Sequence, residues 1–137
     1  MIFTGLILRK LSECPLLNQN GVTAVGFAGM DAKKRSMSIL NTKGELTVDE
    51  HVDGGRDMQY PFVLLYRSPE IDTAGKLAAQ QLIDDVADWL TAEENLPVCV
   101  GCDIQSITRA DTCTLISEDD DGADFQGSFT INYYMEG

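Results

Sequence analysis

The sequence predicts an α+β fold: a mostly antiparallel, mixed β-sheet with a long helix and a short N-terminal helix packed on it. Three observations predict it: an unbroken apolar run at 62–66, a helical stripe of apolar residues within 69–91, and apolar–polar alternation over 125–135. The expected order is helix, three short strands, a central strand, a long helix and three further strands. No repeat or linker interrupts it, so we expect one domain over residues 1–137.

The N-terminal segment is expected to form a helix over about 1–13. Arg9 and Lys10 fall in its last turns, where basic residues are favourable, and Cys14-Pro15 ends it. Its apolar residues recur near helical spacing, at Ile2, Phe3, Leu6, Ile7 and Leu11. A turn at 18–21 and short strands at 22–28, 36–41 and 46–52 follow.

The apolar run Phe62-Val63-Leu64-Leu65-Tyr66 predicts a central strand from about 58 to 67. The run has no polar alternation, which is typical of a strand covered on both faces. It follows the turn Asp53-Gly54-Gly55, and Pro61 near its start removes one ladder hydrogen bond.

The tripeptide Ser68-Pro69-Glu70 predicts the start of the long helix, with a capping hydroxyl, proline at the first helical position and an acid in the first turn. The helix is expected to run from 69 to 91 and to anchor Trp89 in the core. The stripe expected to face the sheet comprises Ile71, Ala74, Ala78, Leu82, Val86 and Trp89.

The C-terminal third is expected to hold strands at 104–109 and 112–117, an acidic turn at 118–124, and a long half-buried strand. The alternation in this last strand predicts that one set of residues points inward: Phe125, Gly127, Phe129, Ile131, Tyr133 and Met135.

The charge is strongly asymmetric. The chain has a net charge of −12; residues 1–68 hold eight basic and seven acidic side chains, and residues 69–137 hold two and fifteen. Such an acidic half repels phosphate within a Debye length of about 8 Å at physiological salt. The composition therefore argues against a protein that grips nucleic acid, but not against one that lets it slide past.

No apolar run approaches the roughly 18 residues that a membrane span needs, so we expect no membrane association. Arg9 and Lys10 follow the first apolar residues, whereas a signal peptide has its basic residues before them. The protein is therefore expected to remain in the cytoplasm where it is made.

The sequence contains little that predicts catalysis. His51 is the lone histidine, no Ser or Cys has a nucleophile-elbow context, and the glycines at 26–29 lack the Lys-Ser/Thr ending of a phosphate loop. Asp119, Asp121 and Asp124 lack the bidentate glutamate and flanking helices of a calcium loop. We therefore expect no enzyme, no cofactor and no metal, and a solvated acidic hairpin tip.

The four cysteines leave one alternative open. Cys99 and Cys102 form a single C-x2-C pair, and a zinc site would need two further ligands from Cys14, Cys113 or His51. A redox pair would open a helix after a strand, whereas this pair precedes an expected strand. We expect reduced thiols; the alternative is a small metal-binding or redox module that uses Cys99 and Cys102.

Three stretches carry a resemblance to a known family: HVDGGRDMQYPFVLLYRS, the helix end VADWLTAEENLP, and DDDGADFQGSFTINYY. Their order and spacing resemble those of the small minor capsid proteins of tailed phages and prophages of Gram-positive bacteria. Those proteins are similar to tail terminators, also called head–tail joining or tail completion proteins. The resemblance covers about residues 2–135 and is thinnest over the first 35.

The resemblance implies a tail-terminator-like fold and a structural virion protein rather than an enzyme. It implies a chain that is monomeric or weakly associated in solution and forms a ring, a hexamer, on the finished tail tube. The ring stops tube polymerisation and docks to the head, with the tail tube protein and the head–tail connector protein as partners. The protein would lie in the virion tail or neck and, during assembly, in the host cytoplasm. The structural alternative is a head-side minor capsid or connector protein.

No catalytic or cofactor-binding residue carries over from this family. In a ring, DNA passes through without being specifically bound, and the turns at 53–57 and 118–124 are free to meet neighbours. The acidic half has two concentrations of charge that could face the channel: the helix face with Gln80, Asp84 and Asp88, and the hairpin tip. We expect the tip, Asp119, Asp120 and Asp121, to face the channel, because a turn projects further than a helix face. We place Arg56 among the interface candidates. The other explanation of the acidic residues is solubility of the monomer.

Overall fold

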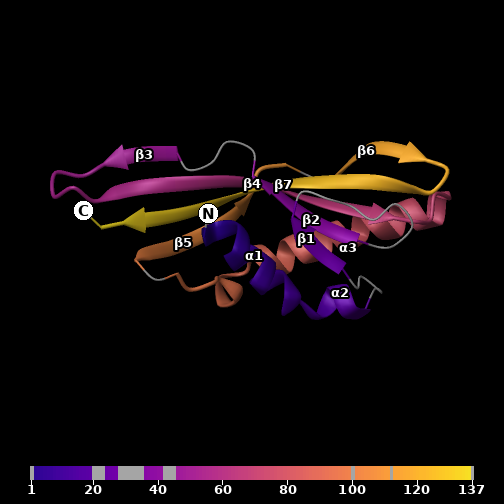
Figure 1. The fold of residues 1–137 in the computed structure, drawn as a ribbon, viewed down its shortest axis with the longest axis horizontal. Helices are drawn as coiled ribbons and strands as arrows, with labels where there is room; N and C mark the ends of the chain where they lie inside the picture. The colour runs from indigo at the N-terminus through magenta and orange to yellow at the C-terminus, as the bar shows by residue number, and fades with distance from the viewer. Residues whose placement is uncertain are drawn as a thin grey trace.

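The computed structural model describes residues 2–19, 24–27, 36–41, 46–99, 101–111 and 113–136. It confirms the α+β class and the order of the main elements (Figure 1). In chain order these are α1 (Ile2–Ser12), α2 (Pro15–Gln19), β1 (Ala24–Phe27), β2 (Ser36–Asn41), β3 (Leu46–Glu50), β4 (Arg56–Ser68), α3 (Thr73–Thr91), the 3-10 turn η1 (Glu93–Asn95), β5 (Cys102–Arg109), β6 (Thr114–Asp119) and β7 (Gly122–Met135).

Two long antiparallel strands form the spine of the sheet. β4 and β7 pair along their whole length, from Arg56 opposite Met135 to Ser68 opposite Ala123. The outer edge of β4 pairs with β3 at one end and with β2 at the other, and the outer edge of β7 pairs with β5 and β6 in the same way. β1 extends the sheet beside β2 as its parallel strand, which makes the sheet mixed, as expected.

β4 is central, as predicted, but the prediction that both its faces are buried is wrong. Burial alternates along the strand: Leu64 and Tyr66 are fully buried, whereas Val63 and Leu65 are only half-buried. The helices α1, α2 and α3 all lie on one side of the long strands, so that side alone carries the main core (Figure 1). An unbroken apolar run therefore marks a central strand here without marking two covered faces.

The long helix starts four residues later than predicted. Ser68 is the last residue of β4, and the helix cap is Asp72, whose carboxylate accepts a hydrogen bond of 2.8 Å from the Gly75 amide. The buried stripe shares only Leu82 and Val86 with the predicted one; Ile71, Ala74 and Ala78 are exposed. The observed stripe is Gly75, Ala79, Leu82, Ile83, Val86, Ala87 and Leu90.

Trp89 is also placed differently from the prediction. It is half-buried at the margin of the core, and the Lys10 ammonium lies 5.7 Å from its ring centroid. Leu90, the next residue, is the one that points into the core. Trp89 thus joins α3 to α1 through a cation–π contact at the surface rather than anchoring α3 on the sheet.

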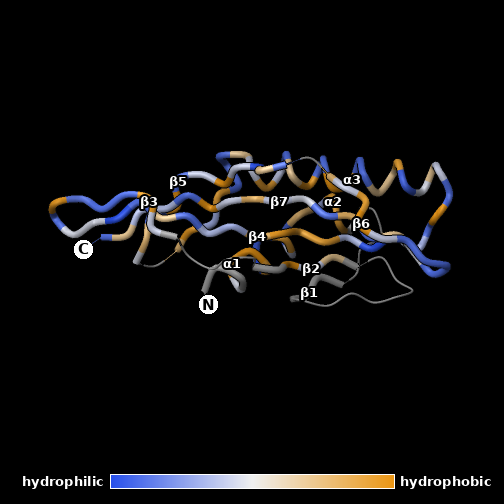
Figure 2. Tube along the Cα trace, turned by 90° about the horizontal axis from the view of Figure 1, so that it is seen from above, coloured by the Kyte–Doolittle hydropathy of each residue, from blue (hydrophilic) through white to orange (hydrophobic). Residues whose placement is uncertain are grey.

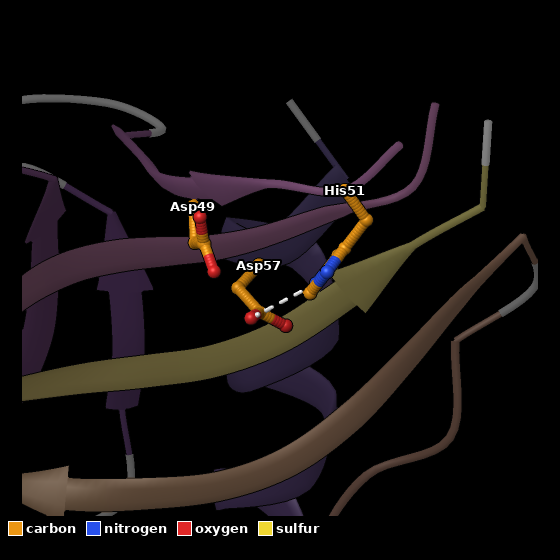
Figure 3. Close-up of side chains that lie close together, drawn as sticks. All are labelled: Asp49, His51 and Asp57. Carbon is orange, nitrogen blue, oxygen red and sulfur yellow. Dashed lines mark hydrogen bonds and ion pairs between the residues drawn. The ribbon is translucent and has the colours of Figure 1, made fainter. Parts of the chain in front are cut away.

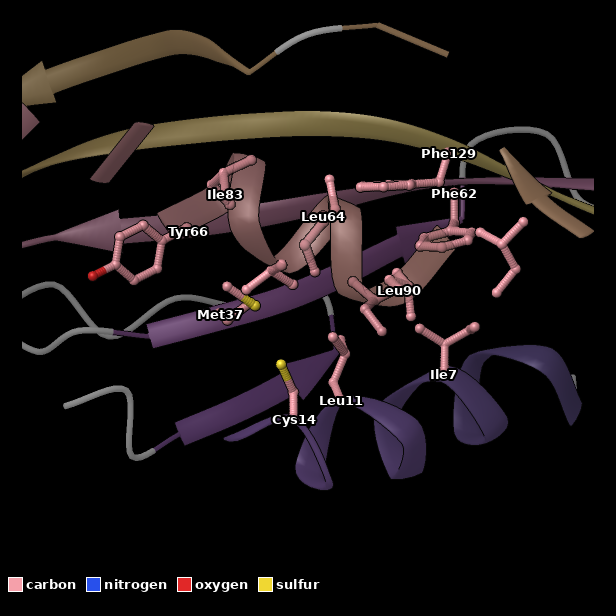
Figure 4. Close-up of a cluster of buried hydrophobic side chains, with 14 of the residues drawn as sticks. Ile7, Leu11, Cys14, Met37, Phe62, Leu64, Tyr66, Ile83, Leu90 and Phe129 are labelled. Carbon is pink, nitrogen blue, oxygen red and sulfur yellow. The ribbon is translucent and has the colours of Figure 1, made fainter. Parts of the chain in front are cut away.

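The N-terminal helix forms as predicted, and Ile7 and Leu11 of α1 reach the core between α3 and the sheet (Figure 4). Pro15 does not end helical structure altogether, because the short helix α2 begins at this residue. Proline is tolerated at a first helical position, where its missing N–H has no intrahelical acceptor. Asn18 lies within α2, and the rest of the turn expected at 18–21 lies partly outside the described residues.

The alternation predicted for the last strand is confirmed. The residues at 125, 127, 129, 131 and 133 are buried, and those between them are half-buried; Met135, the last residue predicted to point inward, is also only half-buried. The strand begins earlier than expected, at Gly122, because the hairpin before it is a tight turn at 120–121 rather than a loop over 118–124. Among the described residues, no helix has the length and apolar character needed to cross a membrane.

Candidate functional site

Hydrophilic residues of the sheet are concentrated toward its two ends (Figure 2). One end, here the hairpin end, comprises the β3–β4 hairpin at 46–59 and the facing end of β7 at 132–136. The other end, here the acidic tip, is the β6–β7 turn at 118–122. The two ends lie at opposite extremes of the β4–β7 pair, so the sheet carries two separate polar surfaces.

The acidic tip is fastened to the body of the protein by Arg67. The guanidinium donates to Asp119 Oδ1 at 2.7 Å and to both carboxylate oxygens of Asp124, at 3.0 and 2.9 Å. Arg67 is only 6% exposed. Asp124 also accepts a hydrogen bond from the Ser117 hydroxyl, and this links β6 to β7.

Asp119 is therefore not a freely solvated tip residue. The Arg67 guanidinium, together with the backbone amides of Asp121 and Gly122 that bond to Asp119 Oδ1, holds the pKa of this carboxyl below its usual value. Asp120 and Asp121 are exposed, and no ion pair involves them within the described part of the chain. They are the two free carboxylates of the predicted set.

This arrangement predicts an acid-sensitive contribution to stability. Because the folded-state pKa of Asp119 is depressed, its stabilising effect is present above the unfolded-state pKa of about 3.9 and is lost as the pH falls through the folded value. Asp119→Asn should lower the melting temperature at neutral pH. The difference from the wild type should shrink as the pH falls below about 4, where the unfolded chain takes up a proton at this position, and it should vanish once the folded wild type is protonated there too.

Asp120→Asn provides the matched control for this measurement, since it removes a carboxylate from the same turn without touching Arg67. Its melting temperature should follow that of the wild type at every pH. A constant gap between Asp119→Asn and the wild type down to pH 2.5 would contradict a role for the ionised Asp119–Arg67 pair.

The hairpin end holds Arg56, the remaining candidate from the sequence. Arg56 begins β4 opposite Glu50 of β3 and Met135 of β7, and it is half-buried. A depression of about 310 Å³ opens at the same end and is lined by Gly101, Cys102, Asp103, Tyr134 and Glu136. The structure thus places Arg56 and the acidic tip at opposite ends of the sheet rather than in one site.

The strands β3 and β6 each pair on one edge only, so within the described part of the chain their outer edges are open. Leu115 and Ile116 of β6 are exposed on such an edge, and Val48 is exposed on β3. Leu77 is exposed on the first turns of α3, where a Lys76–Glu118 hydrogen bond of 2.9 Å ties the helix to β6. Open edges with exposed apolar side chains are surfaces to which other chains can add.

The cysteines do not assemble a metal site in the described residues. There, Asp49, His51 and Asp57 form the only group of three His, Cys, Asp or Glu side chains close enough to share an ion. All four cysteines are free thiols; Cys14 and Cys113 are buried, and Cys99 and Cys102 are half-buried against the core. The C-x2-C spacing thus brings no third ligand to Cys99 and Cys102 in this part of the chain.

The burial of two thiols predicts selective labelling. Desolvation raises the pKa of Cys113 to about 11 and raises that of Cys14, so both remain protonated and unreactive at pH 8. Brief iodoacetamide treatment of the native protein should therefore modify Cys99 or Cys102 and spare Cys14 and Cys113. Peptide mass spectrometry reads the pattern, and all four should react in urea; labelling of Cys113 at the rate of Cys102 in native protein would contradict this.

The Arg67 network was missed in the sequence because Arg67 and its partners are 52 and 57 residues apart. Only the β4–β7 register, which sets Arg67 opposite Asp124, brings them together. The sequence does show that Arg67 ends an apolar strand. It also shows that residues 69–137 contain only two basic side chains, so their many carboxylates have few basic partners in that half of the chain.

Comparison with known proteins adds a likeness of fold. No protein-family model matches the sequence, and no curated protein is significantly similar to it. Among solved structures, a chain from the virion of a native gene transfer agent (GTA) particle matches with a TM-score of 0.67 and 19% sequence identity. The match covers 98% of this chain and 94% of that one, so the two share one fold throughout.

Proposed function

We propose that the protein is a structural component of a phage-like virion, a tail terminator that caps the tail tube as a ring and forms part of the head–tail joint. The observation that carries the proposal is the whole-length fold likeness to a chain of a gene transfer agent virion. The three sequence stretches that resemble phage tail terminators support the narrower assignment.

The distribution of surfaces fits a ring subunit. A stiff two-strand spine connects two ends of different character, and the open edges of β3 and β6 lie at these opposite ends. A contact between unlike surfaces of successive copies closes into a ring when the rotation between them closes. The same spine would keep the spacing between neighbouring copies constant.

Gene deletion in the producing phage or prophage tests the proposal. Without a terminator, tube polymerisation has no stop, so electron microscopy should show tails longer than normal and separate from DNA-filled heads. Supplying the wild-type gene in trans should restore normal tail length and joined particles. The second candidate, a head-side minor capsid or connector protein, predicts tails of normal length and a defect confined to heads.

The free carboxylates of the acidic tip extend the proposal to DNA passage. We place Asp120 and Asp121 toward the channel, where carboxylates repel phosphates and prevent the salt-dependent contacts that Lys or Arg would make. Asp120→Lys with Asp121→Lys should leave folding and particle assembly intact and reduce DNA delivery.

The control for the tip variant is Asp88→Lys, which changes an exposed acid on α3. Asp84→Lys is unsuitable as a control, because Asp84 pairs with Arg109.

Asp88→Lys should leave DNA delivery unchanged. If the double tip variant forms normal particles with normal infectivity, the tip does not line the channel and its acids act in solubility only.

A further inference from the structure

The β3–β4 hairpin brings the only histidine of the chain close to two aspartates, Asp49 and Asp57 (Figure 3). Asp49 and Asp57 are direct register partners across the two strands, so their side chains share one face. His51 follows Asp49 by two residues, and side chains two apart along an extended chain return to the same face. An imidazole and two carboxylates therefore meet within 4.8 Å of one another.

The hairpin fixes this arrangement through its backbone. The His51 amide donates to the Gly55 carbonyl at 2.7 Å, the Gly54 amide donates to the His51 carbonyl at 3.0 Å, and the Gly55 amide donates to Asp53 Oδ1 at 2.9 Å. Gly54 has a φ of 89°, which favours glycine. Tyr134 packs over Gly55, where a Cβ would overlap its ring, and lies 5.7 Å from the His51 ring between centroids.

The spacing of one pair of donor atoms is close to that of two ligands on the same metal ion. His51 Nε2 and Asp57 Oδ2 are 3.2 Å apart. Two ligands bound at about 2.0–2.1 Å to a tetrahedral ion lie about 3.3 Å apart, so this pair already has the required separation. The Asp49 carboxylate is exposed, and its ligand oxygen lies within 4.8 Å of the other two ligand atoms.

The charges favour a dication, and the imidazole selects its class. Two carboxylates directly opposite on neighbouring strands repel each other, and a divalent ion between them removes the repulsion. A purely carboxylate cluster would suit Ca²⁺ or Mg²⁺, which take oxygen ligands. A nitrogen ligand together with carboxylates suits Zn²⁺ and its first-row neighbours, and it distinguishes this hairpin from the acidic surface elsewhere on the chain.

We infer that Asp49, His51 and Asp57 bind one divalent first-row transition-metal ion, and we take Zn²⁺ as the representative ion. Three protein ligands leave a coordination position for water or for a donor from a neighbouring molecule. The site stands at the hairpin end, beside the open edge of β3, and does not depend on the proposed virion role. The side chains of His51 and Asp57 are 42% and 40% exposed, so the ion can enter and substitutions there should leave the fold intact.

Calorimetric titration of the full chain with ZnCl₂ tests the inference. We use a Cys99→Ser, Cys102→Ser background, because the half-buried thiols could bind zinc themselves. One equivalent should bind, and the two C–H proton resonances of the chain's single imidazole should shift in step with the titration. His51→Ala and Asp49→Asn should each weaken binding by at least about 10-fold, since each removes or neutralises a ligand.

Asp103→Asn is the matched control. Asp103 is an exposed acid opposite Tyr134 on β5, at the same end of the sheet but outside the ligand set, so its replacement should leave zinc affinity unchanged. CaCl₂ should bind at least about 10-fold more weakly than ZnCl₂. The inference is overturned if no zinc binds, if His51→Ala binds as tightly as its parent, or if Asp103→Asn weakens binding as much as Asp49→Asn; circular dichroism of each variant checks that it is folded.

Discussion

Phe129→Ala is expected to lower the free energy of unfolding by about 3–5 kcal/mol, the range for truncation of a buried phenylalanine. Phe129 lies in the middle of β7, is 1% exposed, and stacks on its register partner Phe62 with 5.3 Å between ring centroids. The substitution removes this ring from the centre of the spine and leaves a cavity that the two long strands cannot close without losing their register. Urea unfolding followed by tryptophan fluorescence measures the change.

The matched control is Leu115→Ala, which truncates an exposed apolar residue on the edge strand β6 and should change stability by less than about 0.5 kcal/mol. A double-mutant cycle with Phe62→Leu and Phe129→Leu should give a coupling of about 0.5–1.5 kcal/mol from the stacked pair. Equal losses in Phe129→Ala and Leu115→Ala would mean that the spine does not carry the core.

Arg67→Ala is expected to destabilise the protein by about 2–3 kcal/mol, below the range of about 3–5 kcal/mol for a fully buried ion pair. The cost arises because the half-buried Asp124 loses its bidentate partner, whereas the largely exposed Asp119 regains water. The loss of stability should be greatest near the acidic tip. Amide hydrogen exchange should therefore rise more in β6 and in the first residues of β7 than in the rest of the sheet.

Arg67→Lys tests whether the geometry of the guanidinium matters. A lysine keeps the charge but cannot contact Asp119 and both oxygens of Asp124 at once, so it should recover only part of the stability. Arg56→Ala is the comparison at the opposite end of the sheet. Equal stability of Arg67→Lys and the wild type would show that charge alone holds the tip.

The period-2 pattern of the last strand was sufficient to predict the burial of Phe125, Gly127, Phe129, Ile131 and Tyr133, because a strand has only two faces. The helix was harder to predict, since Ser68-Pro69-Glu70 carries a good start signal and yet Ser68 is taken up by pairing with Ala123. Asp72 was an equally good capping residue three positions before Gly75, and local sequence does not decide between two such signals. Choosing the wrong helix start gave a predicted buried stripe on the wrong residues, and that stripe placed Trp89 in the core.

The candidate sites differ in how well they could be predicted from the sequence. Asp49, His51 and Asp57 lie within nine residues around a two-glycine turn that the sequence predicts, but the register that sets Asp49 opposite Asp57 was not predicted. Arg67, Asp119 and Asp124 could not be grouped in this way, because their proximity depends on pairing between the middle and the last strand. Asp120 and Asp121 were assigned to the tip correctly as residues of its turn, while their role in a channel stays a prediction.

The β4–β7 pair also determines when the fold can form. β7 is the last strand in chain order, yet it lies in the middle of the sheet, between β4 on one edge and β5 and β6 on the other. Closing the chain between the two long strands is entropically costly, so local hairpins should form first and the spine last. A polypeptide interrupted before residue 122 lacks the strand to which three others pair, and translation errors of this kind would give unfolded chains rather than defective subunits able to enter an assembly.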